Sequence, residues 1–505
     1  METEETAVRP PRTSRKKGWI VVALILLIVA VGISIYFYVN HLRKTTANPI
    51  EMVPADAALM VQVNNYEEFV NATAFLNNYV SDVVPLVALN GMEYFIQQFS
   101  ESTTASPMAC SAHEVDGRLA LLLSLRISDA DFENLLQVLE INDNNFHEYK
   151  GYHIYEVGTH YRTFSFCYHD GAFSVSENEQ LLYASLDCLA KRKSIADEKG
   201  FQALREMMDK NPKQNWLVVN HAALVASQKS NVAPAFLEAL SSLDKLSDWS
   251  AYQMNVTAGE ISLFGYSVMK DGSLLKQLEG QHPQSMPVNA SIVPASAEDY
   301  ACFRLSDAEQ FSAANSFSEG TKSAFMALQS NEIHCFTLSD SLSYHFFAVK
   351  CDADTAFLLS LLPDGHTLDS VGECGSYHFR HGNFAPVLHA GWRHCTPAVF
   401  MQQGDYLIFS DSIPNLRKYQ VAMKNSGVMD NNQSFILLKS DGRWSDQSGC
   451  CYFFQNGSGN LNKVLNSKLV ARNTALSKTR YVAFYCLEPF QNLIPNNLYI
   501  RFSAQ

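Results

Sequence analysis

The sequence lacks the short motifs that mark the common catalytic and nucleotide-binding sites. It has no HExxH zinc-protease motif, no GxSxG hydrolase turn, no GxxxxGK[ST] phosphate loop and no CxxC pair. A dense run of basic residues is also missing from its 505 residues. Nucleic-acid binding needs such positive charge, because phosphate contacts supply most of the affinity. We therefore expect no nucleic-acid partner and no cofactor, and the sequence favours a binding protein over an enzyme.

One long apolar run is present, from Trp19 to Val39, and its 21 residues carry no charge. A helix of that length crosses a hydrocarbon core of about 30 Å. The run is longer than the roughly 7–15 apolar residues of a cleavable signal peptide. It also ends in bulky aromatic residues where a signal peptidase needs small ones. The run therefore predicts an uncleaved transmembrane signal-anchor, in contact with the lipid bilayer.

The flanking charges predict the direction in which this anchor is inserted. Five basic residues precede it and two follow it: Arg9, Arg12, Arg15, Lys16 and Lys17, then Arg43 and Lys44. The richer side stays in the cytoplasm. Residues 1–18 are then a cytoplasmic tail, 19–39 the anchor and 40–50 a linker. We expect a single-pass protein of the bacterial inner membrane, with a periplasmic or otherwise extracytoplasmic ectodomain that carries a net charge of −17 after residue 44.

The ectodomain sequence repeats itself. A Val-Pro-Ala-x-Ala start occurs at Val53 and again at Val293. Further matches follow in the same order: Asp129 and Asp131 with Asp352 and Asp354, Tyr152-His153 with Tyr377-His378, Ser176 with Ser410, and Trp216–Val219 with Phe435–Leu438. Ordered matches with drifting offsets indicate an internal duplication. We expect two tandem repeats, 51–288 and 289–505, with Pro54 equivalent to Pro294 and a groove between them as the default binding site.

The matched segments predict an α+β fold with largely antiparallel sheets and helices on one face. Strand-like alternation repeatedly leads into a capped helix, with Asn65, Ser128 and Ser176 as the expected caps. The apolar segment LALLLSLRI predicts a central strand. Alternating residues on both sides of Thr257–Glu260 predict a β-hairpin at the end of the first repeat.

An N-terminal anchor, a Val-Pro-Ala-x-Ala strand start and a duplicated α+β ectodomain together resemble the bacterial membrane-anchored families known only as domains of unknown function. The resemblance covers the anchor and most of the ectodomain. It implies no catalytic residues.

Histidines and a cysteine gather in one part of the second repeat, and they are weak candidates for a metal site: His378, His381, His389, His394 and Cys395. Imidazole and thiolate suit zinc or copper. Against this, His378 and His381 would face opposite sides of a strand. Scattered structural histidines are the alternative that the spacing favours, so no metal is predicted.

Two other sets of residues allow a functional or a structural interpretation. Cys450 and Cys451 are adjacent, but on a strand their thiols would point apart, so a redox switch is not favoured. The eleven cysteines are an odd number, and several lie in apolar runs as small buried side chains. The acids Asp129 and Asp131 could bind a cation, but they also suit the positive end of a helix. The helix-start interpretation is favoured.

Two hypotheses about function remain. The first is an envelope protein whose duplicated ectodomain acts as a binding or scaffolding module for an unknown protein or ligand. The alternative is an envelope hydrolase on glycan or peptide substrates, with an active site that no motif reveals. A cleft with converging titratable groups would favour the enzyme.

Overall fold

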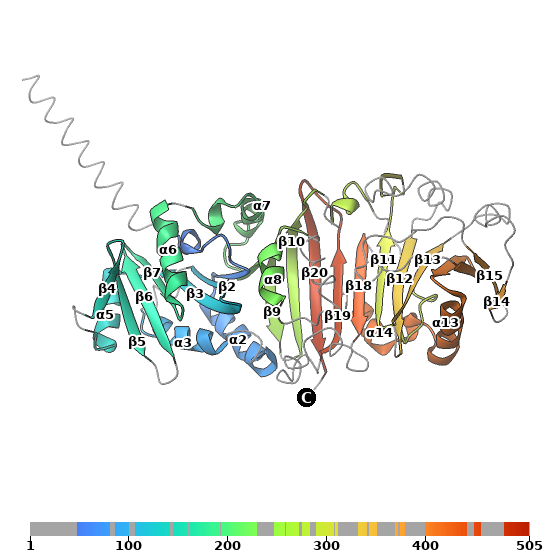
Figure 1. Ribbon diagram of the computed structural model, residues 1–505, viewed down its shortest axis with the longest axis horizontal. Coiled ribbons are helices and arrows are strands. Elements are labelled where there is room, and N and C mark those ends of the chain that lie inside the picture. The colour runs from blue at the N-terminus through green and yellow to red at the C-terminus, as the bar shows by residue number, and fades with distance from the viewer. Residues whose placement is uncertain are drawn as a thin grey trace, which may run out of the picture.

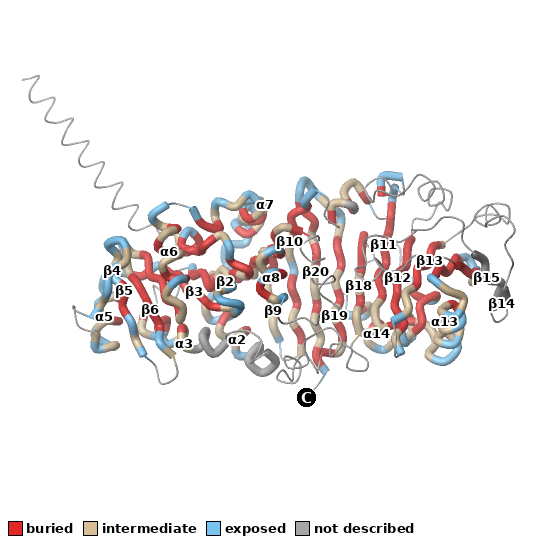
Figure 2. The backbone as a smooth tube through the Cα atoms, viewed as in Figure 1, coloured by how far each residue is buried: buried red, intermediate tan, exposed pale blue. Residues whose placement is uncertain are grey.

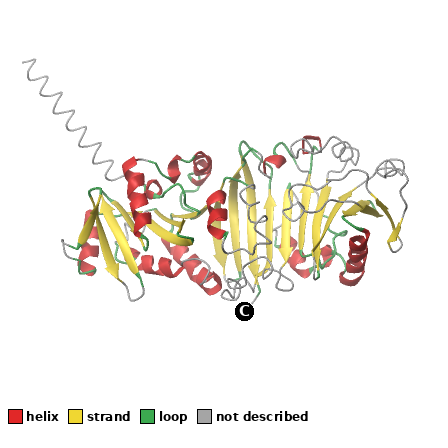
Figure 3. Ribbon diagram, in the orientation of Figure 1, coloured by secondary structure: helices red, strands yellow, loops and turns green. Residues whose placement is uncertain are grey.

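The computed structural model describes residues 48–80, 86–99, 107–141, 145–158, 162–191, 193–229, 247–257, 259–271, 275–282, 289–307, 309–311, 332–340, 343–350, 369–371, 374–378, 399–441, 449–455 and 479–503. Twenty strands of these residues form one sheet along the long axis of the molecule (Figures 1 and 3). Every described strand pair is antiparallel. The predicted α+β class with antiparallel strands is therefore confirmed.

The first ten strands occupy one half of the sheet: β1 (Leu59–Val63), β2 (Met108–Val115), β3 (Arg118–Arg126), β4 (Phe146–Tyr149), β5 (Tyr152–Gly158), β6 (Thr163–His169), β7 (Ala172–Ser176), β8 (Trp216–Asn220), β9 (Trp249–Thr257) and β10 (Glu260–Val268). They pair side by side in the order β4-β5-β6-β7-β3-β2-β1-β8-β9-β10. The predicted central strand is β3, which lies between β2 and β7.

The other ten strands occupy the second half: β11 (Asp299–Arg304), β12 (Glu332–Ser339), β13 (Ser343–Lys350), β14 (Asp369–Val371), β15 (Cys374–His378), β16 (Val399–Gln403), β17 (Tyr406–Ser410), β18 (Cys450–Gln455), β19 (Thr479–Cys486) and β20 (Leu493–Phe502). Their order is β14-β15-β16-β17-β13-β12-β11-β18-β19-β20. Adding ten to each strand number of the first half gives this same order.

A single strand pair, β10 with β20, joins the two halves. Nine residues of β10, Glu260 to Val268, are opposite Arg501 to Leu493 in β20. Side chains reinforce the backbone ladder, since Asn496 Nδ2 donates to Ser267 Oγ at 2.8 Å and Arg501 Nη1 lies 3.1 Å from Glu260 Oε2. The border between the halves is thus a continuous strand pair, and the two pockets described below both lie within the first half.

The described helices of the first half are the 3-10 turn η1 (Pro49–Met52), α2 (Tyr66–Val80), α3 (Leu86–Ile96), α5 (Asp129–Val138), α6 (Glu179–Lys191), η2 (Ile195–Asp197), α7 (Lys199–Met208) and α8 (His221–Gln228). Those described in the second half are α13 (Ile413–Ser426), η6 (Met429–Asn431) and α14 (Gln433–Ser440). The 3-10 turn η4 (Leu275–Leu278) follows β10 and packs in the core of the second half. Figure 2 shows the buried residues running along the strands through both halves.

Helices cover both faces of the first half, and the expectation of helices on one face was wrong. Alternate residues of β1 point to opposite faces. Val63 packs in one core cluster with Phe69 of α2 and Phe95 of α3. Met60 packs in another cluster with Phe201 of α7 and with Trp216. Both faces of β1 are therefore buried, as its mainly apolar sequence allows.

The structure locates the predicted repeat positions in the following way. Pro54 and Pro294 each accept a turn hydrogen bond just before a strand, from Ala57 N at 3.2 Å and from Ala297 N at 2.9 Å. Asp354 lies outside the described residues. Two matches were wrong. Trp216–Val219 is in strand β8, whereas Phe435–Leu438 is in helix α14.

The other wrong match concerns Tyr377. The strand ladders can be counted from the matched serines Ser176 and Ser410. Tyr377 is then opposite Phe400, as Tyr155 is opposite Phe166. Tyr377 therefore matches Tyr155 and not Tyr152.

Two of the three predicted helix caps are confirmed. Asn65 Oδ1 accepts from Glu68 N at 3.2 Å, and Ser128 Oγ accepts from Asp131 N at 3.1 Å. The third was wrong, because Asn178 Oδ1 caps α6 through Leu181 N at 3.1 Å. Ser176 instead donates to the carbonyl oxygen of Leu121 at 2.6 Å.

The predicted anchor, Trp19–Val39, lies outside the described residues. Within the part of the chain that the structure describes, no helix is both long and apolar enough to span a bilayer. The eight cysteines whose side chains are described are all buried: Cys110, Cys167, Cys188, Cys302, Cys335, Cys450, Cys451 and Cys486.

The border strands make a clear prediction at Gly265 of β10. A Cβ atom there would lie 1.9 Å from the carbonyl oxygen of Ala251 in β9, which is backbone and cannot rotate away. Gly265→Ala should therefore lower the free energy of unfolding by about 3 kcal/mol, measured by thermal or denaturant unfolding. The control is Gly158→Ala in β5, where nothing lies within 4 Å of the added atom. Equal stability of the two variants would contradict the close packing of β9 on β10.

Candidate functional site

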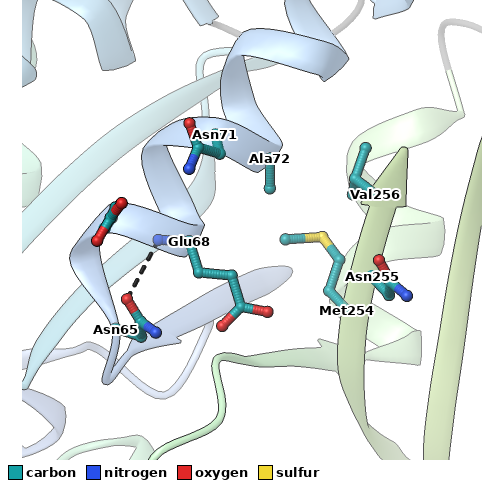
Figure 4. A pocket seen from close by; sticks show the side chains of 8 residues that line it. Asn65, Glu68, Asn71, Ala72, Met254, Asn255 and Val256 are labelled. Carbon is teal, nitrogen blue, oxygen red and sulfur yellow. Dashed lines mark hydrogen bonds between the residues drawn. The ribbon is translucent and has the colours of Figure 1, made fainter. Parts of the chain in front are cut away.

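A pocket of about 320 Å³ lies between the start of α2 and the end of β9 (Figure 4). Its lining residues are Asn65, Glu67, Glu68, Asn71, Ala72, Met254, Asn255 and Val256. Figure 4 shows the Glu68 side chain extending from the first turn of α2 into the space that Met254 borders from β9. Carboxylate and amide groups thus face this space from the helix, beside two apolar side chains of the strand.

Asn215, which the sequence did not single out, holds the junction from which α2 begins. Its Oδ1 accepts from Asn64 N and Asn65 N, each at 2.8 Å, and its Nδ2 donates to the carbonyl oxygen of Asn65 at 2.9 Å. The residue is buried. Three hydrogen bonds to backbone fix the chain where β1 becomes α2, and so fix the backbone from which the pocket glutamates extend.

A second pocket of about 240 Å³ lies at one end of β1. Its lining residues are Asn48, Pro49, Ile50, Gln62, Pro107, Arg126, Arg205 and Asp209. Arg205 Nε lies 3.9 Å from Asp209 Oδ2, so one of the two arginines has an acidic neighbour.

Ser111, His113 and Asp56 form a hydrogen-bonded line of the kind found in serine hydrolases. His113 Nε2 is 2.9 Å from Ser111 Oγ, and His113 Nδ1 is 3.0 Å from Asp56 Oδ1. In a hydrolase the serine would be accessible, but here the serine is buried and the aspartate is exposed. Ser111 is only 1% exposed, whereas the Asp56 side chain is 76% exposed. A nucleophile must reach its substrate, so this line stabilises β2 and the turn before β1.

The hydrogen-bonded line changes the pKa of its aspartate. The hydrogen bond from His113 holds the pKa of Asp56 below its usual value. A carboxyl whose pKa is lower in the folded chain stabilises that chain above the unfolded pKa, and this contribution disappears as the pH falls.

In the second half, a buried polar cluster lies on one face of β11 and β12. Cys302 Sγ lies 3.8 Å from Glu332 Oε1, and His334 Nε2 lies 3.4 Å from the same oxygen. Burial lowers the pKa of His334 to about 3, and the nearby Arg304 adds to the effect. Burial also raises the pKa of Glu332 and holds that of the Cys302 thiol well above its usual value. Burial thus disfavours the charged form of each of these three groups.

The predicted metal candidates are not brought together by the described residues. The backbone of His378 is in β15, and its side chain is not described. His381, His389, His394 and Cys395 lie outside the described residues. The cluster at Cys302 was missed, although the alternation Glu332-x-His334 could have signalled two ligands on one face.

The structure also locates the adjacent cysteines Cys450 and Cys451 and the helix-start acid Asp131. Cys450 is opposite Phe303 and Cys451 is opposite Cys302, so the two neighbouring thiols lie on opposite faces of β18. Asp131 is buried at the start of α5 and accepts from Ser128 Oγ at 3.0 Å. The helix-start interpretation of Asp131 is confirmed.

Comparison with known proteins adds little. No family model matches this chain, and no curated protein matches it. Among solved structures, crystal forms III and I of TP0453 are similar at 14% and 13% identity, with TM-scores of 0.29 and 0.28. Each match covers 44% of this chain and 82% of that chain. At these TM-scores the similarity supports no conclusion about fold or function.

The Ser111–His113–Asp56 line predicts a pH-dependent effect of Asp56→Asn. At neutral pH the variant should unfold more easily, by less than about 1 kcal/mol because the carboxylate is exposed. The difference from the unmodified chain should shrink as the pH falls below about 4, where the aspartate is protonated in the unfolded chain. Unfolding measured from pH 7 to pH 2 checks this.

Asp405→Asn is the matched control, since this aspartate is exposed in the turn between β16 and β17. A stability difference for Asp56→Asn that stays constant over the whole pH range would contradict the role given to its carboxylate.

Proposed function

We propose that this protein is a non-enzymatic binding module, held at a membrane by its N-terminal segment. The observation that carries the proposal is the pocket between α2 and β9, with two glutamates and three asparagines among its lining residues. We propose that it binds a cationic group of an extracytoplasmic partner. None of its lining residues is basic, and the chain after residue 44 has a net charge of −17.

Rigidity supports a binding rather than a catalytic role. The pocket glutamates extend from a helix whose start is fixed by Asn215, and the opposite wall is a strand of the central sheet. A fixed backbone at the site reduces the conformational entropy that is lost when it binds. The hydrolase alternative has one specific observation, the Ser111–His113–Asp56 line, and the burial of Ser111 counts against it. We do not propose that alternative.

The membrane location is a proposal that depends on sequence. The uncharged run Trp19–Val39 has the length of a bilayer-spanning helix, and the flanking basic residues favour a cytoplasmic N-terminus. We propose an inner-membrane protein with a periplasmic ectodomain, similar to the bacterial anchored families of unknown function.

We also propose that the ectodomain arose by duplication of a segment like 51–288. Three features support this: the matching strand orders of the two halves, the turns at Pro54 and Pro294, and the bonds made by the valines just before those prolines. Val53 O accepts from Ile195 N at 2.9 Å, and Val293 O accepts from Met429 N at 2.7 Å. In both halves that bond leads through a 3-10 turn into a helix, η2 into α7 and η6 into α14.

The binding proposal is tested with a tetralysine peptide as the cationic probe. The double variant Glu67→Gln and Glu68→Gln should bind it about three- to ten-fold more weakly in calorimetry, since each exposed charge contact contributes up to about 1 kcal/mol. Added salt should reduce the difference. The control is Glu133→Gln with Glu206→Gln, two exposed helical acids on α5 and α7 that give the same net charge. Equal weakening in both double variants, or no binding by the unmodified chain, would refute the pocket.

The proposed orientation is tested by a fusion after Gln505. A reporter enzyme that functions only outside the cytoplasm should be active there. Replacing Arg15, Lys16 and Lys17 by Asn should reduce that activity, because it removes the charge difference across the anchor. Activity of a reporter that functions only inside the cytoplasm would contradict the proposed location.

A further inference from the structure

Three side chains of the types that bind transition metals converge on one face of the second half of the sheet. Cys302 of β11 is directly opposite His334 of β12, and Arg304 is opposite Glu332. Because alternate residues of a strand share a face, Glu332 and His334 point the same way as Cys302. The fold therefore brings a thiol, a carboxyl and an imidazole together from positions about 30 residues apart in the sequence.

The distances between these groups fit a tetrahedral metal ion. Metal–nitrogen and metal–oxygen bonds of about 2.0–2.1 Å and a metal–sulfur bond of about 2.3 Å place neighbouring ligand atoms roughly 3.3–3.6 Å apart. His334 Nε2 is 3.4 Å from Glu332 Oε1, and Cys302 Sγ is 3.8 Å from it. All three ligand atoms lie within 4.8 Å of one another. Only small side-chain shifts are needed to coordinate one ion.

The hydrogen bonding of His334 points independently to a ligand. The ring is 0% exposed, and Nδ1 is 3.0 Å from the hydroxyl of Tyr300. Nε2 makes no hydrogen bond, although it faces Glu332 and Cys302. A buried polar atom without a partner destabilises the folded chain. Histidines that bind metals donate one ring N–H to an oxygen and direct the other nitrogen at the ion. The tautomer of His334 with its proton on Nδ1 would donate to Tyr300 Oη and leave Nε2 free to coordinate.

The positively charged guanidinium of Arg304, opposite Glu332, would repel a cation bound at this site. Without metal, its charge balances that of Glu332 while the thiol and imidazole are neutral. With a divalent ion, the thiol loses its proton to solvent, and the thiolate and carboxylate together neutralise the metal. The buried guanidinium of Arg304 then keeps a net positive charge beside the site, which lowers the affinity for the ion without blocking the three ligand atoms.

We propose that Cys302, Glu332 and His334 bind one divalent transition-metal ion of the zinc type, which stabilises the second half of the ectodomain. Thiolate and imidazole ligands favour zinc or cobalt over magnesium or calcium. Since Cys302, Glu332 and His334 are buried, with at most 8% of each exposed, the ion would enter as the chain folds and would add its binding energy to stability. Glu332 and His334 sit on β12 and Cys302 on β11, so the ion would join these two strands.

The test uses the full chain, purified with zinc present and then dialysed. Elemental analysis should give about one zinc per chain. Replacement by cobalt should give a thiolate-to-cobalt charge-transfer band, which reports a cysteine ligand directly. Cys302→Ser should lose the band, and His334→Gln and Glu332→Gln should weaken metal binding by at least ten-fold. A strong chelator should lower the melting temperature of the unmodified chain.

The control is Cys335→Ser. Cys335 is equally buried on β12, but its side chain lies on the opposite face of the sheet from His334. It should retain the metal and the cobalt band. Circular dichroism of each variant shows whether the fold is retained. No bound metal in the unmodified chain would overturn the proposal. So would full binding by a folded Cys302→Ser chain, which would place the metal elsewhere, for example among the histidines 378–394.

Discussion

The backbone pairing of β10 with β20 is the interaction on which the rest of this structure depends. Each of these strands would otherwise present a nine-residue row of unpaired amides and carbonyls at an inner edge. Pairing satisfies both rows at once, and Asn496 and Arg501 add side-chain bonds across the same border. The two halves are consequently parts of one sheet, and sites far apart in the sequence share a common frame.

The sequence predicted the local structure well where a short segment determined it. The apolar β3, the β9–β10 hairpin and the caps Asn65 and Ser128 all depend on residues near one another. Long-range pairing was not predictable in this way, because the residues of β10 contain nothing that selects β20 as a neighbour. The mistake at Phe435–Leu438 has a simple cause, since four apolar residues suit a strand or a buried helix equally well.

The candidate sites were harder to predict for a similar reason. The pocket glutamates Glu67 and Glu68 look like ordinary helix-start acids until β9 is placed opposite them. The cluster at Cys302 depends on strand register, and a shift of one residue would turn His334 to the other face. The role of Asn215 could not be predicted from the sequence, because it depends on hydrogen bonds to the distant backbone of residues 64 and 65.

The use of β10 and β20 as each other's partner also bears on self-association. Ten-stranded halves that stood apart would have four open edges, and open edges are where chains add to one another as aggregates. Joined as they are, the described strands leave two, β4 and β14, which have four and three residues. Short outer strands make poor templates for intermolecular pairing, so the join that enlarges the sheet also removes the long edges through which it could polymerise.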